Sequence, residues 1–298
     1  MSKIGSSHSM TYDGMPKNLF GYDVVDFLGE GAGSVIYVVN RPENHQIYAL
    51  KHVVRRNEKD VRFIEQLENE FQVSQKFSHP GLRRSIDCKV TRTLLRKPTE
   101  AMLVMELFDG IPLDQQQSRE PIATVDVFIA VAEALDALHG YGFVHCDLKP
   151  NNILVSARGD VKVIDFGQAC PVGTAKPRIQ GTPDFISPEQ VKCEAVTVRT
   201  DVFNFGATMY WALTGRSLPT LFNIQKSKSE NTLLFDGLIP TPASLNPRVP
   251  ESLSNLVMEC VKTNPLKRPA DMKEVARRLE IIRHSMKRQA DQASSTVA

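Results

Sequence analysis

The sequence is poor in the features that mark several classes of protein. Its five cysteines are odd in number, and no two of them form a CxxC pair. This argues against a disulfide framework or a zinc site and favours free thiols in a reducing compartment. The longest run without a charged residue, 202–215, is too short to span a bilayer. No apolar stretch of a secretory signal follows Lys3, so we expect a cytoplasmic protein without a membrane segment.

An excess of one charge is also lacking. The 36 Lys and Arg residues stand against 34 Asp and Glu, which gives a net charge of +2 and implies no polyanionic partner. The basic stretch 277–287 favours a solvated helix face over a nucleic-acid site. With 298 residues, 42% of them hydrophobic, the chain can bury a sizeable core as one large or two small units.

Short strands are predicted in the first part of the chain. Residues 1–18 are rich in Ser, Gly and Met and show no period, which indicates a flexible tail. After it, strands are predicted at 22–28, 35–39, 47–54, 85–93 and 101–106, and a helix at 59–78. This part, about 19–107, is predicted to be a small β-rich lobe with one helix.

Helical patterns dominate the remainder. Apolar residues recur at helical spacing in four stretches, 127–138, 200–213, 253–261 and 272–282. Gly215 follows the second stretch and is predicted to end it. About 108–286 is therefore predicted to be a larger, mainly helical lobe, and the polar residues 287–298 a flexible C-terminal tail.

Four side chains between 147 and 165 carry the chemistry. Asp147 lies five residues before Asn152, Lys149 lies between them, and Asp165 follows thirteen residues after Asn152. Together they offer a base, a cation that faces phosphate and two oxygen ligands for magnesium. Phosphoryl transfer from ATP needs this set, because its loose transition state is stabilised mostly by positioning and charge neutralisation.

A glycine-rich segment precedes these residues in the small lobe. Residues 28–34 read LGEGAGS between two predicted strands, and glycines let backbone N–H groups approach phosphates with no Cβ in the way. A plain tight hairpin is the alternative interpretation. Lys51 closes the third strand, and taken alone it would be a solvated strand lysine.

These motifs resemble those of the protein-kinase family. Residues 145–152, HCDLKPNN, and 165–167, DFG, are similar to the H-R-D-L-x-x-x-N and D-F-G signatures. The resemblance covers about 20–285, has its motifs in family order, and looks most like bacterial Hanks-type Ser/Thr kinases. It implies a bilobal α+β protein-kinase fold, with a small antiparallel-sheet N-lobe carrying one main helix and a larger, mainly helical C-lobe.

The resemblance implies how ATP is bound. The Gly-rich loop would cover the phosphates, Met105 would be the gatekeeper, and backbone groups of Glu106 and Phe108 would bind adenine. The ATP-binding residues implied are Leu28, Gly29, Glu30, Gly31, Ala32, Gly33, Ser34, Ile36, Ala49, Lys51, Met105, Glu106, Phe108 and Leu154. Ser34 occupies the family's third glycine position and Gly33 is an extra glycine at the tip, a departure that bears on how tightly the loop closes over ATP.

The roles of the polar residues follow from the same resemblance. Asp147 would orient the substrate hydroxyl and accept its proton, and Lys149 would neutralise the γ-phosphate. Asn152 and Asp165 would hold Mg2+, with Mn2+ as a possible replacement. Lys51 would contact the α- and β-phosphates.

Lys51 then needs a carboxylate partner on the helix that follows it. Glu65, Glu68 and Glu70 are the candidates. At about 100° per residue, Glu70 lies closest to the apolar stripe of this helix, so we predict Glu70 as the partner, with a neighbouring glutamate as the alternative. Ser74, one turn later, departs from the apolar residue that the family packs there, which bears on how firmly the helix is held.

Further positions match the activation segment and the scaffold of the family. Thr182, together with Lys149 after the base, is similar to Ser/Thr kinases and differs from tyrosine kinases. Glu189 is expected to form a buried pair with Arg268, and Asp201 is expected to brace the catalytic loop.

Cys146 is a departure from the family. Many kinases carry at this position an Arg that binds a phosphorylated residue of the activation loop, and a cysteine cannot form that charge-assisted pair. We therefore expect an activity that does not depend on phosphorylation within 168–181.

The sequence thus predicts a non-specific serine/threonine protein kinase, dependent on ATP and Mg2+, that acts on Ser and Thr hydroxyls of protein substrates. One alternative is a pseudokinase scaffold that binds ATP without transfer, but Lys51, Asp147 and Asp165, whose loss usually marks such proteins, are all present. A second is a kinase-like enzyme acting on small molecules, against which the peptide-docking segment around Thr182 argues.

Overall fold

The computed structural model describes residues 15–31, 33–116, 120–219 and 236–297. The chain divides into two compact units, each described here by itself. Unit 1 runs to Leu67 and includes Ser85–Leu107, and unit 2 comprises Glu68–Arg84 and the chain from Phe108 onward. The cut at 107/108 coincides with the predicted end of the small lobe, whereas 68–84 belongs to unit 2.

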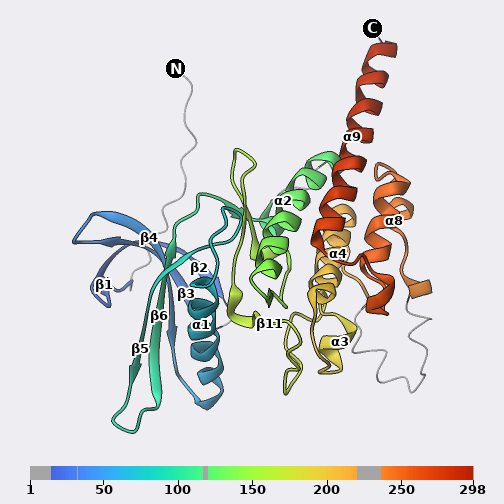
Figure 1. The fold of residues 1–298 in the computed structure, drawn as a ribbon. Coiled ribbons are helices and arrows are strands. Elements are labelled where there is room, and N and C mark those ends of the chain that lie inside the picture. Colours follow the sequence, from blue (N-terminus) through green and yellow to red (C-terminus); the bar gives the residue numbers. More distant parts are fainter. Residues whose placement is uncertain (1–14, 32, 117–119, 220–235, 298) are drawn as a thin grey trace, which may run out of the picture. The chain divides into compact units, whose positions relative to one another are not determined.

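Unit 1 is built on a six-stranded antiparallel sheet in the order β1-β2-β3-β4-β6-β5 (Figure 1). The strands are β1 (Asn18–Leu19), β2 (Tyr22–Gly31), β3 (Ser34–Arg41), β4 (Gln46–Val54), β5 (Ser85–Arg92) and β6 (Pro98–Glu106). Val39, Leu50, Met102 and Val104 are fully buried in its core. The five predicted strands are present. Strand β1 was not predicted, because two residues are too short to show an alternating pattern.

Helix α1 (Val61–Ser74) begins in unit 1 and continues into unit 2. A capping box between Asn57 and Asp60 starts the preceding 3-10 turn, η1 (Glu58–Asp60), and this satisfies backbone N–H groups at the helix start. The helix ends four residues before the predicted position, at Ser74, whose hydroxyl donates to the carbonyl of Phe71 at 3.0 Å. Such back-bonding competes with continuation of the helix.

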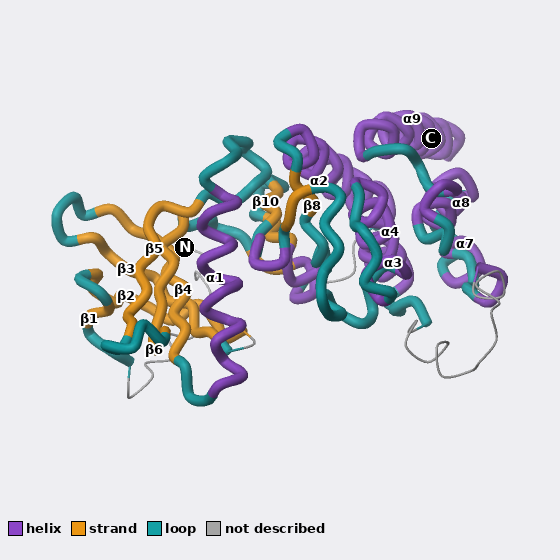
Figure 2. Tube along the Cα trace, turned by 60° about the horizontal axis from the view of Figure 1, so that its bottom comes forward, coloured by secondary structure: helices purple, strands orange, loops and turns teal. Residues whose placement is uncertain are grey.

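Unit 2 is mainly helical (Figure 2). Its longer helices are α2 (Pro121–Gly140), α4 (Val198–Thr214), α8 (Glu251–Cys260) and α9 (Met272–Val297), and its short ones α3 (Pro188–Val191) and α7 (Pro242–Leu245). Helix α2 packs against α4 and α9, with Phe128 edge-on to Phe205 at 5.2 Å. The four predicted helices are present, and Gly215 ends α4 in the left-handed conformation, at φ +69°.

Short strands in unit 2 frame the loops that carry the predicted chemistry. Strands β7 (Ile111–Pro112), β9 (Ile153–Val155) and β10 (Val161–Val163) form a sheet in the order β10-β9-β7, and β8 (Phe143–Val144) pairs with β11 (Cys170–Pro171). The predicted α+β architecture, with an antiparallel-sheet lobe and a larger helical lobe, is confirmed.

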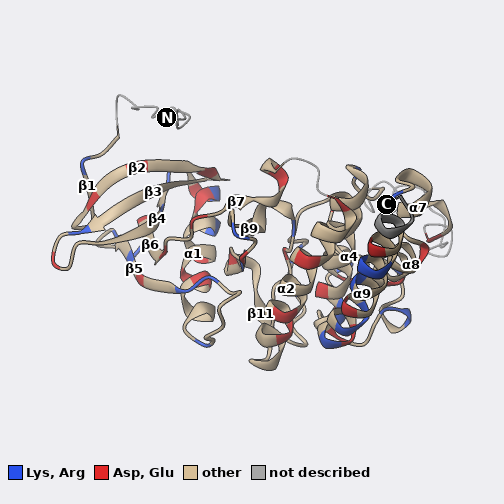
Figure 3. Ribbon diagram, turned by 90° about the horizontal axis from the view of Figure 1, so that it is seen from above, with Lys and Arg blue, Asp and Glu red and all other residues tan. Residues whose placement is uncertain are grey.

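Helix α9 extends beyond its predicted end. The sequence predicts a helix over 272–282 and a flexible tail from 287, whereas the structure continues the helix to Val297. Residues 287–297 contain no Gly or Pro, so nothing in them interrupts a helix. Arg278 pairs with Glu259 and Arg283 with Asp126, at 2.6 and 3.2 Å, so the basic face visible on α9 in Figure 3 is partly neutralised. None of the helices within the described ranges combines the length and hydrophobicity of a membrane span.

Candidate active site

A buried carboxylate on α4 holds the backbone of the 145–149 loop. Asp201 accepts hydrogen bonds from the N–H groups of His145 and Cys146, at 2.7 and 2.9 Å, and pairs with His139 at 2.8 Å. Burial by itself raises the pKa of Asp201, but the hydrogen bond and charge of His139 and those of His145 outweigh burial and hold this pKa below its ordinary value. The brace that the sequence predicts is therefore present.

Asp147 lies at the centre of a contact among three polar side chains. Lys149 Nζ donates to Asp147 Oδ2 and to Thr182 Oγ1, each at 3.0 Å, and the Thr182 hydroxyl donates to Asp147 Oδ1 at 2.9 Å. The side chains of Asp147 and Lys149 keep 10% and 23% of their surface exposed, so both are partly accessible to solvent. A carboxylate held in this way has a fixed orientation and still has lone pairs that can accept the hydrogen of a hydroxyl.

Asn152 and Asp165 are the two residues that the resemblance predicts as metal ligands. Asn152, in η3 (Pro150–Asn152), donates through Nδ2 to the carbonyl of Asp147 at 2.8 Å, which leaves the amide oxygen as its ligand atom. Asp165 has a left-handed backbone, at φ +66°, and its carboxylate accepts from the N–H of Gly167 at 3.4 Å. One amide oxygen and one carboxylate suit Mg2+, which binds through few protein groups and takes further ligands from substrate phosphates.

The described part of the chain contains no group of three or more His, Cys, Asp and Glu side chains that could hold a metal ion.

His145 packs within the core behind the 145–149 loop. It is fully buried, and its ring packs edge-on to Phe166 at 5.4 Å. Its Nδ1 accepts from the N–H of Asp147 at 3.2 Å, and its Nε2 lies 3.1 Å from the carbonyl of Ile164. These two contacts tie the 145–149 loop to the segment that leads to Asp165.

Asn69 is a residue that the sequence analysis missed. Its side-chain Nδ2 donates to three carbonyl groups of the segment after Asp165, those of Phe166, Gly167 and Ala169, at 2.9 to 3.2 Å. One amide thereby holds the backbone of the DFG segment against α1. The sequence signal for this role was a polar side chain that directly precedes Glu70, beside the apolar face of α1.

Of the three glutamates considered on α1, Glu70 is the buried one, at 1% exposed, whereas Glu68 is half-buried and Glu65 exposed. Arg83 Nη2 lies 3.6 Å from Glu70 Oε1. Glu70 is thus a buried carboxylate next to a cation in unit 2. Lys51 belongs to unit 1, so the pair between Lys51 and Glu70 stays a prediction.

The Gly-rich segment forms the turn between β2 and β3 of unit 1. Gly31 and Ser34 are the last paired residues before the turn, and Ala32 lies outside the described residues. Gly33 has φ +78°, and a Cβ there would lie 2.4 Å from the ring of Phe63. Both the backbone conformation and the space therefore require glycine at this position, which gives the extra glycine a physical reason.

The strand register places other predicted residues on one face of the unit 1 sheet. Ile36 of β3 lies opposite Lys51 of β4, and Ala49 of β4 lies opposite Met105 of β6. Because side chains alternate between faces along a strand, all four share a face. Ala49 and Met105 are buried there. The face thus combines apolar side chains with one lysine, which suits a flat ring attached to an anion. Leu28, Gly29 and Glu30 lie in β2, and Glu106 ends β6.

Phe108 and Leu154 belong to unit 2. Lys162 Nζ lies 5.5 Å from the centre of the Phe108 ring, and a Cβ on Gly110 would lie 2.5 Å from that ring, so close packing fixes the ring. Leu154 lies in β9 opposite Lys162 of β10. Phe108 thus lies in the loop between β6 and β7, and Leu154 lies in β9.

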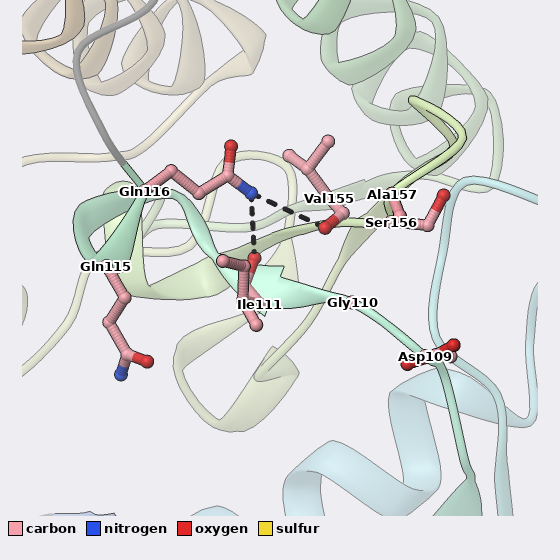
Figure 4. A pocket seen from close by; sticks show the side chains of 8 residues that line it. All are labelled: Asp109, Gly110, Ile111, Gln115, Gln116, Val155, Ser156 and Ala157. Atoms are coloured by element: carbon pink, nitrogen blue, oxygen red, sulfur yellow. Dashed lines mark hydrogen bonds between the residues drawn. The ribbon is translucent and has the colours of Figure 1, made fainter. Parts of the chain in front are cut away.

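A pocket lies beside β7 and β9 in unit 2 (Figure 4). It is lined by Asp109, Gly110, Ile111, Gln115, Gln116, Val155, Ser156 and Ala157. Gln116 Nε2 donates to the carbonyls of Ile111 and Val155, at 3.2 and 3.4 Å. None of the residues predicted to bind ATP or to act in catalysis lines this pocket, so we assign it no part in the candidate site.

The predicted buried pair between Glu189 and Arg268 is present. Arg268 donates from both Nη atoms to the two oxygens of Glu189, at 2.7 and 3.0 Å, and the Thr200 hydroxyl donates to the same carboxylate at 2.9 Å. Both charged residues are at most 5% exposed, and the guanidinium lies 4.9 Å from the ring centre of Phe203. The pair connects α3, next to the segment that contains Thr182, to the helical core.

Comparison with known proteins accords with this arrangement. The family model for the protein kinase domain matches residues 22–279. A probable serine/threonine-protein kinase PknB of Lactococcus lactis is 29% identical over 264 residues, which are 85% of this chain and 40% of that protein. A probable serine/threonine-protein kinase of Clostridium perfringens is 26% identical over 270 residues, 88% of this chain and 38% of that protein. The serine/threonine-protein kinase PknB of Mycolicibacterium smegmatis is 30% identical over 206 residues, 65% of this chain and 32% of that protein.

The chain therefore spans 32 to 40% of the length of these relatives. The family model, in contrast, covers nearly all of the chain that the structure describes, and it includes both units. The chain belongs to the protein kinase family.

Proposed function

We propose that this chain is a serine/threonine protein kinase that transfers the γ-phosphoryl group of ATP to Ser or Thr hydroxyls of protein substrates. The contact among Asp147, Lys149 and Thr182, all within 3.0 Å, carries the proposal. It unites a candidate base, a cation and a hydroxyl of the activation segment, and the Lys149–Thr182 bond supports selectivity for Ser and Thr over Tyr.

Asp147 would accept the proton of the substrate hydroxyl. Its two oxygens keep lone pairs beyond those used by Thr182 and Lys149, and the hydrogen bonds from the loop backbone to Asp201 fix the direction of the loop. A positioned base of this kind contributes roughly 100-fold to 10,000-fold to the rate.

The cationic groups would act on the phosphates of ATP. Lys149 would neutralise charge on the transferred group, and Lys51, paired with Glu70, would orient the α- and β-phosphates. Asn152 and Asp165 would hold Mg2+, or Mn2+ in its place, which when bound neutralises the phosphate oxygens.

The remaining predicted residues would bind the nucleotide itself. The hairpin at 28–34 would cover the phosphates with its backbone N–H groups. Ile36, Ala49 and Met105, which share one face of the unit 1 sheet, would enclose adenine together with Leu154. Backbone groups of Glu106 and Phe108 would donate to and accept from the ring.

The test is transfer of labelled phosphate from ATP, with magnesium, to the protein itself and to a generic Ser/Thr-rich substrate. Wild type is compared with Asp147→Asn and with a control, Asp160→Asn, which alters an exposed carboxylate in the turn at 156–160. We expect Asp147→Asn to lower transfer by at least about 100-fold and the control to leave it unchanged.

Two results would contradict the proposal. If neither wild type nor variant transferred phosphate while ATP still bound, the chain would be a pseudokinase scaffold. If Asp147→Asn transferred as fast as wild type, Asp147 would not be the base. Asn152→Ala is expected to raise the magnesium concentration needed for half-maximal transfer, which separates the metal ligand from the base.

A further inference from the structure

We propose that Cys146 and Cys170 form a reversible disulfide that ties the activation segment to the catalytic loop. Their Sγ atoms lie 3.7 Å apart. Cys170 begins β11 and is paired with Val144 of β8, and Cys146 follows two residues after Val144. An antiparallel pair therefore brings the two sulfurs to the same place, and only a small approach separates them from a bond of about 2.05 Å.

The two thiols differ in solvent exposure. Cys146 is 1% exposed and clusters with Val144 and Val196, and the half-buried Cys170 packs against this cluster. The Cys170 sulfur is thus accessible to a small oxidant, whereas the Cys146 sulfur is buried in an apolar environment. This is the usual arrangement of a sensing thiol and a resolving thiol.

The same geometry sets the reactivity of each sulfur. The hydrogen bond from Cys146 lowers the pKa of Cys170 to about 7, with Lys176 and the Thr174 hydroxyl acting in the same direction and burial and Asp201 opposing them. The bond to Cys170 and burial raise the pKa of Cys146 well above its ordinary value. Cys170 is therefore the thiolate that attacks first.

With hydrogen peroxide as the oxidant, the atoms balance in two steps. The Cys170 thiolate attacks one peroxide oxygen, and the other oxygen leaves as hydroxide and is protonated to water, which gives a sulfenic acid. The Cys146 sulfur then attacks the Cys170 sulfur, loses its proton, and displaces the hydroxyl as a second water. Two thiols and one peroxide yield one disulfide and two waters, and exchange with a thiol reductant restores both thiols.

The bond would restrain the activation segment more than the catalytic loop. The N–H of Cys146 is bonded to Asp201, and its carbonyl accepts from Gln190 Nε2 at 2.7 Å, so the position of Cys146 is fixed on both sides. Formation of the disulfide therefore requires Cys170 and β11 to move toward Cys146. A covalent link would then occupy the position where many kinases use a charge pair between Arg and phosphate.

The test begins with the full chain, oxidised with a few-fold excess of hydrogen peroxide, alkylated and digested without reductant. Mass spectrometry is expected to find a cross-linked pair of peptides containing Cys146 and Cys170 as the main disulfide product, which dithiothreitol removes. The rate of its formation is expected to rise from about pH 6 to pH 8 as the thiolate forms. Hydrogen exchange of the backbone amides at 170–175 is expected to slow by roughly tenfold on oxidation, because the link opposes local opening.

Two serine variants make the assignment specific. Cys170→Ser should abolish both the cross-link and the slower exchange, whereas Cys193→Ser, at another half-buried cysteine, should preserve both. Separate alkylation of Cys146 and Cys170 after oxidation, a main product through another cysteine, or unchanged exchange in the oxidised protein would overturn the proposal. These measurements need no phosphate transfer, so their result stands apart from the proposed kinase activity.

Discussion

The two units hold their parts of the candidate site in different ways. In unit 2, side chains from distant segments fix the catalytic loop, with Asp201 and Gln190 both bonded to the backbone of Cys146. In unit 1, backbone pairing and a glycine conformation fix the Gly-rich hairpin, where Gly33 lies against Phe63. Removing one partner of a buried hydrogen bond or ion pair leaves the other partner buried and unpaired, which lowers the free energy of unfolding strongly. We therefore expect substitutions of the unit 2 anchors to cost more stability than substitutions in the hairpin.

The largest loss of stability is expected from Arg268→Ala. The variant would leave Glu189 charged and buried without its bidentate partner, which costs about 3–5 kcal/mol in the free energy of unfolding. Arg278→Ala is the matched control, because Arg278 pairs with a Glu259 side chain that is 44% exposed, and such a pair contributes only about 0.2–1 kcal/mol. Urea unfolding of both variants measures the difference, and equal losses would show that burial does not separate the two pairs.

The next largest loss of stability is expected from Asp201→Asn, at about 1–3 kcal/mol in the free energy of unfolding. The single amide oxygen cannot accept hydrogen bonds from both N–H groups of the loop, which in wild type bind different carboxylate oxygens. The pKa of Asp201 is lowered in the folded state. Its ionised form therefore adds stability above the unfolded pKa of about 3.9, and this contribution is lost as the pH falls through the folded pKa.

The stability difference between wild type and Asp201→Asn should thus stay constant from about pH 7 to pH 5 and shrink below about pH 4. Asp126→Asn, at a carboxylate that is 48% exposed, is the control and should change stability little at any pH. A wild-type advantage that grew as the pH fell would contradict the direction of the pKa shift.

The same contrast explains what could be predicted from the sequence. Apolar periods located the strands and helices, and the short motif at 145–152 carried its own chemistry, because those signals are local. The bonds from Asn69 to the DFG segment and the approach of Cys146 to Cys170 join residues far apart in the chain. No local sequence pattern around these polar residues and cysteines predicts such contacts. Strand β1 and the end of α9 were missed for a second reason, since neither carries an apolar pattern.

In unit 1, Gly33→Ala is expected to cost less than the two unit 2 variants. Ala at a positive φ costs about 1–2 kcal/mol, and Gly21→Ala shares this cost, since Gly21 has φ +94° and open space around its Cβ position. Gly33→Ala adds a collision with the Phe63 ring, so it alone should also displace the hairpin and weaken ATP binding, as measured by calorimetry.

Adding Phe63→Ala to Gly33→Ala would remove the ring that the new methyl group meets. We expect this second substitution to restore part of the lost ATP affinity, a coupling that a double-mutant cycle detects. Equal ATP affinity in Gly33→Ala and Gly21→Ala would show that the contact with Phe63 does not position the hairpin.

The smallest effect is expected at Thr174, the single Ser, Thr or Tyr within 168–181. Cys146 offers no cation to a phosphate in this segment, so Thr174→Ala should leave phosphate transfer unchanged. Thr182→Ala is the contrasting variant, because Thr182 contacts both Asp147 and Lys149, and the loss of one such hydrogen bond, about 1.4 kcal/mol, lowers the rate roughly tenfold. If Thr174→Ala abolished transfer, and phosphorylation of Thr174 restored it to phosphatase-treated wild type, the segment would depend on added charge after all. A cationic side chain at a position other than 146 would then bind the phosphate on Thr174 and restrain the activation segment.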